Sequence, residues 1–216
     1  MPIALIVGAG SGLSASLARA FHARGLTPVL AARDVSKLAD LAAETGAGTV
    51  AADASTEDGV SAIFEAVDAT GDELAIAVYN PSYRVRGSIA EVDPAEVQKA
   101  LQITAYGAFL VGQQAARRML ASGGGTILFT GASAGVKGYP LSAAFAMGKF
   151  ALRGLAQSMA RELHPKGVHV AHVVIDGMIR NPGRTEPADK PDSMLDPDAI
   201  AQTYVQLNEQ DRSIWT

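Results

Sequence analysis

Short apolar runs alternate with longer helix-forming stretches along most of the chain, and this alternation restricts the fold more than any other feature. Six runs predict strands, at residues 3–7, 28–32, 49–53, 74–80, 126–131 and 168–176. Most are continuously apolar, which is typical of strands buried on both faces of a parallel sheet. The stretches between them predict helices at residues 13–24, 35–45, 56–69, 94–121 and 142–164.

This order predicts an α/β fold, a Rossmann-type doubly wound parallel sheet of six strands with helices on both faces. No linker, repeat or low-complexity segment interrupts the pattern before about residue 180, so we expect residues 1–216 to form one domain. A chain of this size buries roughly 70% of its unfolded surface and needs no disulfides.

Composition excludes several classes of function. The chain has no cysteine, which excludes disulfides and thiolate chemistry. Its net charge of −4 shows no excess of positive charge of the kind that binds nucleic acid. No apolar run approaches the ~20 residues of a membrane span. The first strand begins at residue 3, so we expect no signal peptide. The four histidines show no metal-ligand spacing. We therefore expect a soluble, cytoplasmic protein without metal, membrane or nucleic-acid partners.

A glycine-rich loop follows the first predicted strand and precedes the first predicted helix. Gly8, Gly10 and Gly12 lie in it. Glycines there permit a tight turn and close approach of a pyrophosphate to backbone N–H groups at a helix N-terminus. The alternative is a tight turn without a ligand. In this context the loop predicts a dinucleotide site.

The end of the second strand favours NADP(H) over NAD(H). An NAD site places an acidic residue there for the ribose 2′-hydroxyl, whereas an NADP site tolerates none and uses an arginine. Ala32 stands at the acidic position and Arg33 follows it. A guanidinium can form a bidentate contact with a 2′-phosphate. The alternative is a solvated arginine, with Asp34 capping the next helix.

With these residues, the chain resembles the short-chain dehydrogenase/reductase family from residue 3 to about 180. Its loop is similar to the family's TGxxxGxG pattern but has Val7 for the threonine and Ser14 for the last glycine. Asp53 matches an aspartate that contacts adenine, or else caps the following helix. The resemblance implies cofactor contacts from Gly8, Gly10, Ser11, Gly12, Leu13, Arg33, Asp53, Ala54, Asn80, Pro81, Lys149, Gly177 and Ile179.

The resemblance implies an incomplete catalytic tetrad. The family uses Asn, Ser, Tyr and Lys, with the tyrosine as general acid or base and the lysine lowering its pKa and binding the ribose. Here Thr104, Ala132 and Phe145 stand at the first three positions, and only Lys149 is retained. Loss of a positioned acid typically costs 10²–10⁴-fold in rate, or about 3–5 kcal/mol of barrier. The chain resembles a divergent subgroup with Phe in place of the tyrosine.

Other hydroxyl groups are candidates for the missing one. Ser133 is the neighbour of Ala132, and a small loop shift would present its hydroxyl to a substrate. Tyr139 is a weaker candidate, and Tyr83 and Tyr106 are expected near the mouth of the cleft.

Two functions stay open. The first is an NAD(P)(H)-dependent oxidoreductase acting on CH–OH or C=O groups of a small carbonyl, alcohol or enone substrate. Its proton source is the substrate itself or water held by Ser133 and Lys149. The second is a catalytically inactive NADP(H)-binding sensor, scaffold or partner subunit. A third reading, loss of nucleotide binding, rests on Val7, Ser14 and Asp176.

The loops around the expected cleft leave two further questions open. Residues 181–198 are rich in Pro and Asp and are either a surface loop or a mobile flap over the site. Positive residues near the opening indicate either an acidic substrate or ordinary solvated charges: Arg84, Arg86, Lys137, Arg180 and Arg184.

The resemblance also implies a homodimer or homotetramer, because family members commonly pair their two long helices with those of a neighbour. Small residues on the second long helix would permit close approach, and they are Ala143, Ala144, Ala146 and Ala151. Internal packing alone would also explain them.

Overall fold

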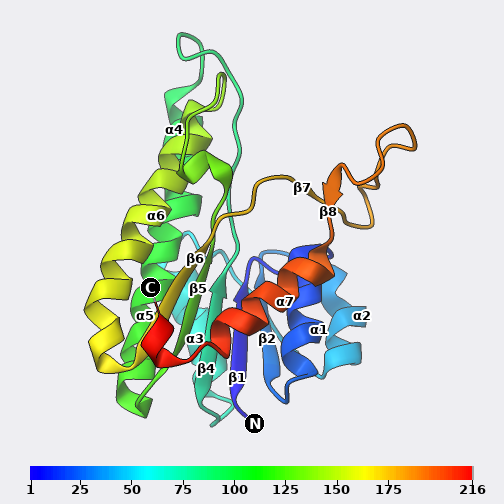
Figure 1. The fold of residues 1–216 in the computed structure, drawn as a ribbon. Helices are drawn as coiled ribbons and strands as arrows, with labels where there is room; N and C mark the ends of the chain where they lie inside the picture. Colours follow the sequence, from blue (N-terminus) through cyan, green and yellow to red (C-terminus); the bar gives the residue numbers. More distant parts are fainter. Residues whose placement is uncertain (216) are drawn as a thin grey trace.

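A six-stranded, wholly parallel sheet forms the centre of the computed structural model, which describes residues 1–215 (Figure 1). The strand order is β3-β2-β1-β4-β5-β6. The strands are β1 (Ile3–Val7), β2 (Thr27–Ala32), β3 (Gly48–Ala51), β4 (Leu74–Tyr79), β5 (Gly125–Thr130) and β6 (Val168–Val173). The doubly wound sheet predicted from the apolar runs is confirmed. β6 is shorter than the predicted 168–176, because the chain leaves the sheet after Val173.

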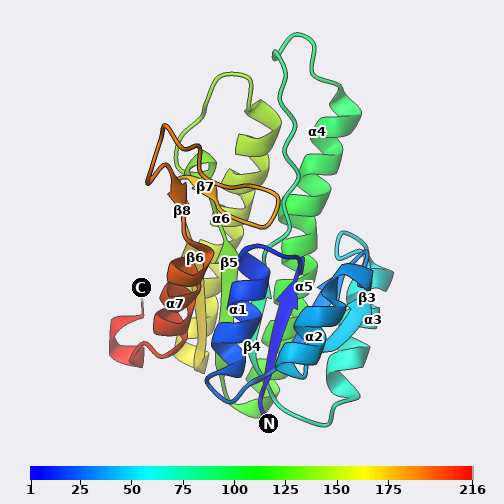
Figure 2. The same cartoon turned by 90° about the vertical axis from the view of Figure 1, so that its right-hand side faces the viewer.

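Helices cover both faces of the sheet, as predicted (Figures 1 and 2). One core cluster packs the sheet against α3 (Glu57–Asp68), α5 (Gly107–Ser122) and α6 (Ala143–Leu163). The other packs it against α1 (Leu13–His22), α2 (Ala39–Thr45) and α7 (Pro197–Asn208). Figure 1 shows α4 (Pro94–Leu101) and the start of α6 projecting beyond the carboxyl end of the sheet. These two helices therefore border one side of the space beyond the carboxyl ends of the strands.

The helix predicted over residues 94–121 is interrupted, which is a correction to the sequence prediction. A π-helical turn, Gln102–Tyr106, joins α4 to α5. The hydroxyl of buried Tyr79 donates to the carbonyl of Ile103 within this turn. Gly107 follows, and a Cβ atom there would meet the Tyr79 hydroxyl and lie 2.5 Å from the Ala54 carbonyl oxygen. The glycine therefore lets the wide turn pack directly on β4.

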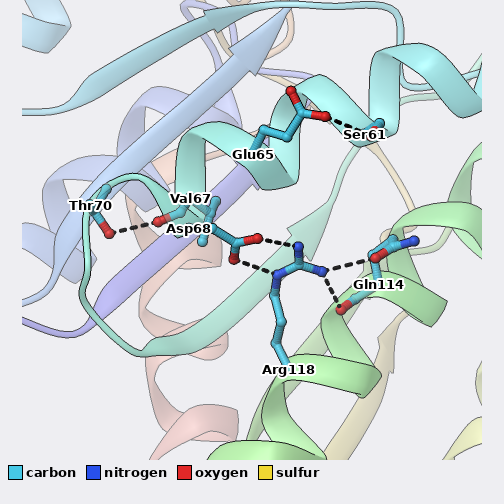
Figure 3. A network of polar contacts seen from close by, with 7 residues as sticks. All are labelled: Ser61, Glu65, Val67, Asp68, Thr70, Gln114 and Arg118. Carbon is cyan, nitrogen blue, oxygen red and sulfur yellow. Dashed lines mark hydrogen bonds and ion pairs between the residues drawn. The ribbon is translucent and has the colours of Figure 1, made fainter.

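Arg118 fixes α5 against α3 on the face of the sheet that α3, α5 and α6 cover (Figure 3). Its Nε and Nη2 atoms donate to the two carboxylate oxygens of Asp68 at 2.7 and 2.5 Å, and Nη1 donates to the side chain of Gln114. The guanidinium carbon lies 4.5 Å from the ring centroid of Phe64. The contact lowers the pKa of Asp68 through hydrogen bonds from the guanidinium. This bidentate geometry orients two helices that frame the sheet.

The C-terminal part contains elements that the sequence did not predict. Two-residue strands β7 (Met178–Ile179) and β8 (Met194–Leu195) pair in parallel and close the segment between them into a loop. α7 follows, and the Asp196 side chain caps it by accepting from the Asp198 N–H. Along residues 1–215, none of the helices has the length and apolar character needed to cross a membrane.

Candidate active site

The glycine-rich loop lies at the carboxyl end of β1, where the strand order reverses between β1 and β4. Gly8 has a φ of +79°, and a Cβ atom there would lie 2.8 Å from Cγ of Pro81. A side chain at position 8 would therefore be strained by both backbone and packing. Gly12 precedes α1 and supplies no side-chain cap. The uncapped N–H groups and the helix dipole suit a phosphate group.

Ser14, which departs from the family pattern, joins this loop to β4. It is 2% exposed. Its hydroxyl donates to the Gly8 carbonyl oxygen at 3.0 Å and accepts from the Asn80 amide at 2.7 Å. The serine thus ties together the carboxyl ends of the two strands that flank the switch point. Sequence reasoning missed this role, since the motif marks Ser14 only as a substitution.

A cavity of about 620 Å³ opens beside β2 and β3. Five of the candidate cofactor residues line it: Gly8, Arg33, Asp53, Ala54 and Pro81. Arg33 is exposed and forms no ion pair with any residue of 1–215. Its guanidinium is therefore available to an anionic ligand at this end of the cleft.

Asp53 has a local role in the same cavity. Its Oδ1 accepts from the N–H of Ser55 at 3.0 Å and from the Ser55 hydroxyl at 2.7 Å. These hydrogen bonds hold the pKa of Asp53 below its ordinary value. The helix cap is supplied by Thr56, whose side chain accepts from Gly59 N–H, so the alternative in which Asp53 caps α3 is wrong.

A second cavity, of about 390 Å³, lies over the ends of β4, β5 and β6. It brings together eight candidate residues: Gly12, Leu13, Asn80, Ala132, Phe145, Lys149, Gly177 and Ile179. Ser82 lines both cavities, so the two adjoin. The remaining candidates line neither cavity, and they are Gly10, Ser11, Thr104 and Ser133.

Lys149 is the buried cation of the second cavity. It is 2% exposed, and its Nζ donates to the Thr130 carbonyl oxygen at 2.7 Å. Burial lowers the pKa of Lys149 from 10.5 to about 8, because desolvation disfavours the charged form. Near neutral pH the amine therefore holds a proton that it can release.

Phe145 and Ala132, which we expected in place of hydroxyl-bearing residues, line this cavity and give it an apolar wall. The Phe145 ring is half-buried, one turn before Lys149 on α6. The ammonium nitrogen of Lys149 lies 5.8 Å from the ring centroid, and the guanidinium carbon of Arg84 lies 5.4 Å from it. Two cations thus share one ring. The contact with Arg84 was not predicted, because it joins α6 to the loop that follows β4, and the two are distant in the sequence.

Thr104 lies in the π-helical turn, and its side chain contacts the backbone of the loop after β4 and lines neither cavity. It is 1% exposed, and its hydroxyl oxygen accepts from the backbone N–H of Tyr83 at 3.2 Å. The Tyr83 hydroxyl donates to Glu96 at 2.7 Å. Together these bonds anchor the loop that follows β4.

The other hydroxyl candidates are held elsewhere. The backbone N–H of Ser133 donates to the Ile175 carbonyl oxygen at 3.1 Å. Tyr139 lies beside Lys137, whose ammonium is 5.4 Å from its ring centroid. The Tyr106 hydroxyl donates to Glu57 at 2.9 Å. None of these three hydroxyl-bearing residues lines the cavity around Lys149.

The family model for short chain dehydrogenases matches residues 2–192. The chain belongs to the short-chain dehydrogenase/reductase family. Its six-stranded parallel sheet with helices on both faces matches the fold of the family's solved structures.

Three relatives illustrate the range of this short-chain dehydrogenase family. A short-chain dehydrogenase structure from Rhodopseudomonas palustris is 39% identical, with a TM-score of 0.85, and the match covers 100% of this chain and 95% of that one. A metagenomic short-chain oxidoreductase in complex with NADP is 26% identical, with a TM-score of 0.84 and coverage of 100% and 94%. The trans-4-hydroxycyclohexanecarboxylate dehydrogenase of Sinomonas cyclohexanicum is 30% identical over 83% of this chain and 72% of its own.

Proposed function

We propose that this chain is an NADP(H)-dependent oxidoreductase that transfers hydride to or from a small carbonyl, alcohol or enone substrate. The observation that carries the proposal is the buried Lys149 amine in a cavity that adjoins the dinucleotide cleft. The metagenomic relative bound to NADP supports a nicotinamide cofactor for the same fold.

The residues of the cleft fit such a cofactor. Gly8 and Gly12 place no side chain at either end of the loop, and the uncapped start of α1 suits the pyrophosphate. Arg33 at the end of β2 suits a 2′-phosphate, since Ala32 offers no carboxylate for a 2′-hydroxyl. When bound, the nicotinamide ring supplies or accepts the hydride.

Lys149 is our candidate for the proton source. One of its N–H groups is committed to the Thr130 carbonyl, which leaves the others for a water or a substrate oxygen. A lysine with a pKa of about 8 lies in the range in which general acids work at neutral pH. In the reductive direction the ammonium protonates the oxygen that gains charge, directly or through one water. Asn80, held by Ser14, orients the neighbouring loop.

Binding and turnover test the proposal in sequence. We expect calorimetry to show NADPH binding in the micromolar range and much weaker NADH binding. NADPH oxidation should then be found with a carbonyl or enone panel, and Lys149→Met should abolish it even at NADPH concentrations that saturate the variant. If neither nucleotide binds, the proposal is wrong.

Arg33 gives a direct test of cofactor preference. Arg33→Gln removes the guanidinium from the rim of the cleft, so NADPH binding should weaken by about ten-fold or more while NADH binding stays unchanged. Arg24→Gln, at an exposed arginine after α1, is the control. Equal losses for both nucleotides would contradict the assignment of Arg33 to the 2′-phosphate.

Restoring the family's hydroxyl groups tests the geometry of the cavity. Phe145→Tyr with Ala132→Ser should raise carbonyl reduction, because a phenol between two cations is easily ionised. The expected gain is of the order of the 10²–10⁴-fold contribution of a positioned acid. No gain would mean that the substrate cavity itself has diverged.

A second candidate function is an NADP(H)-binding sensor, scaffold or partner subunit without chemistry. The apolar wall of Phe145 and Ala132 favours it. Tight NADPH binding, no turnover with the whole panel and an NADPH-dependent change in assembly would select this function over the first.

We also propose a homodimer or homotetramer that pairs α5 and α6 with those of a second copy. Large apolar side chains are exposed on these helices: Phe109 (41%), Leu120 (40%), Met147 (49%) and Phe150 (45%). Light scattering on the purified protein tests the proposal, and a monomer at micromolar concentration would refute it.

A further inference from the structure

Four cationic residues line the cavity around Lys149: Arg84, Lys149, Arg180 and Arg184. Among the described residues that line it, there is no aspartate or glutamate. The chain as a whole carries a net charge of −4, so the positive cavity is a local feature rather than the average character of the protein. A low-dielectric cavity with one sign of charge favours a ligand of the opposite sign.

The arginines differ in how their charges are compensated. Arg180 forms an ion pair with Asp196 at 2.7 Å. Arg84 and Arg184 form no ion pair with any carboxylate in residues 1–215. The two unpaired guanidinium groups are therefore the candidates for binding an anion.

Arg84 is held in a defined place although it is exposed. Its guanidinium carbon lies 5.4 Å from the centroid of the Phe145 ring. The preceding residue, Tyr83, is bound at its backbone N–H by Thr104 and at its hydroxyl by Glu96. A guanidinium held over an aromatic ring by a cation–π contact does not use its N–H donors for that contact, so they remain able to bind an oxyanion.

Arg184 lies on the side of the glycine-rich loop. Its backbone pairs with Asn181, whose Cβ lies 3.5 Å from the place of a Cβ atom on Gly12. An anion near Arg184 therefore has two sources, the pyrophosphate of the cofactor or the substrate. Arg84, on the ring of Phe145, is the residue that distinguishes them.

We infer that the substrate carries an oxyanion, a carboxylate or a phosphate ester, and that Arg84 binds it from its place over the Phe145 ring. This inference rests on the proposed function, since it names the substrate class of the same cavity. An anion there also stabilises the protonated form of Lys149, which faces the same ring at 5.8 Å. Substrate recognition and proton supply are then coupled through one aromatic side chain.

Matched anionic and neutral ketones test the inference. The pairs are 4-oxocyclohexanecarboxylate with cyclohexanone, and dihydroxyacetone phosphate with dihydroxyacetone. Calorimetry with excess NADP⁺ measures binding without turnover, and kcat/KM with NADPH measures reduction. We expect at least one anion to bind about ten- to hundred-fold more tightly than its neutral partner, as for hydrogen bonds to a charged group.

Arg84→Gln should remove this preference and leave the affinity for NADP⁺ unchanged. Arg86→Gln, two residues along the same loop and outside the cavity, should retain the preference and is the matched control. The inference is overturned if wild type shows no preference in either pair, or if Arg84→Gln retains it. It is also overturned if Arg84→Gln weakens NADP⁺ binding by the same factor, because Arg84 would then serve the cofactor.

The two proposals fail in different ways. Turnover of ketones without any anion preference would keep the oxidoreductase and reject the role of Arg84. Anion binding that depends on Arg84, with no turnover of any ketone, would keep the anion site and reject the oxidoreductase.

Discussion

Replacing Lys149 by methionine should stabilise the protein at neutral pH although it removes the group we consider essential for activity. Methionine fills a similar volume and carries no charge. Burial lowers the pKa of Lys149 from 10.5 to about 8. Because one pKa unit is equivalent to 1.36 kcal/mol, keeping the charged amine buried costs about 3 kcal/mol. The lost hydrogen bond to the Thr130 carbonyl offsets about 1 kcal/mol of the gain.

The sign of the pH dependence follows from proton linkage. Between the folded pKa of about 8 and the ordinary 10.5, the unfolded chain binds more protons than the folded one. The free energy of unfolding of the wild type therefore rises with pH across this window, and the contribution is lost again as pH falls through 8. Lys149→Met has no such group. Its advantage over wild type should thus shrink by about 2.5 kcal/mol between about pH 6.5 and pH 10.

Urea unfolding of both proteins at these two pH values measures the change. Titrating groups that Lys149 does not influence cancel in the difference between the two proteins, and packing terms are independent of pH. His172, whose pKa is lowered to about 4 mainly by burial and secondly by the charge of Lys149, is already neutral in the folded protein at about pH 6.5. Lys166→Met, at an exposed lysine, controls for loss of a surface charge. A difference between wild type and Lys149→Met that is constant to within about 0.5 kcal/mol would refute the reasoning, since it would mean that Lys149 titrates alike in both states. The same pKa predicts that carbonyl reduction falls as pH rises above about 8.

Two further predictions concern the supports of the site. Gly107→Ala should destabilise the protein by about 1–3 kcal/mol, because its Cβ would overlap the Tyr79 hydroxyl. Gly154→Ala, at a helical position with open space around it, should stabilise the protein by about 0.5–1 kcal/mol. Urea unfolding of the two variants tests this difference, and equal stabilities would contradict the packing argument. Ser14→Ala leaves the partly buried Asn80 amide without its acceptor, so we expect a loss of about 0.5–1.5 kcal/mol in unfolding free energy together with weaker NADPH binding by calorimetry. An unchanged affinity would show that the loop keeps its shape without this bond.

The α/β sheet could be predicted from the sequence because its signal is local. Each buried strand is a short run of apolar residues, and the predicted strands at 3–7 and 126–131 match β1 and β5 to within a residue. The π-helical turn could not be predicted, because Gln102–Tyr106 continues a helix-forming pattern and its geometry depends on Tyr79 in another element. β7 and β8 have only two residues each, too few to show a period.

The candidate site also has parts that a local sequence pattern predicts and parts that depend on contacts between distant residues. The glycine-rich loop and Lys149 belong to motifs with fixed spacing, so both could be proposed as site residues from the sequence, and the structure places residues of both along two adjoining cavities. The bond between Ser14 and Asn80 joins residues 66 positions apart, and the contact of Arg84 with Phe145 joins the loop after β4 to α6. Such pairs are brought together by the order of strands in the sheet, so no local sequence pattern predicts them. Sequence reasoning accordingly yields candidate cofactor contacts more readily than candidate substrate contacts.

The cost of Lys149 bears on the choice between an enzyme and a binding protein. An oxidoreductase needs a group that stabilises charge and releases a proton, and this need accounts for a buried amine that lowers the stability by about 3 kcal/mol. A protein that only holds a dinucleotide would use the same amine solely as a cofactor contact. Phe145 removes the phenol but keeps a ring that Lys149 and Arg84 both face. The two cations that would stabilise a phenolate can equally stabilise an oxyanion of the substrate. The cavity therefore retains the electrostatics of the reaction without the tyrosine, which is why we favour the oxidoreductase.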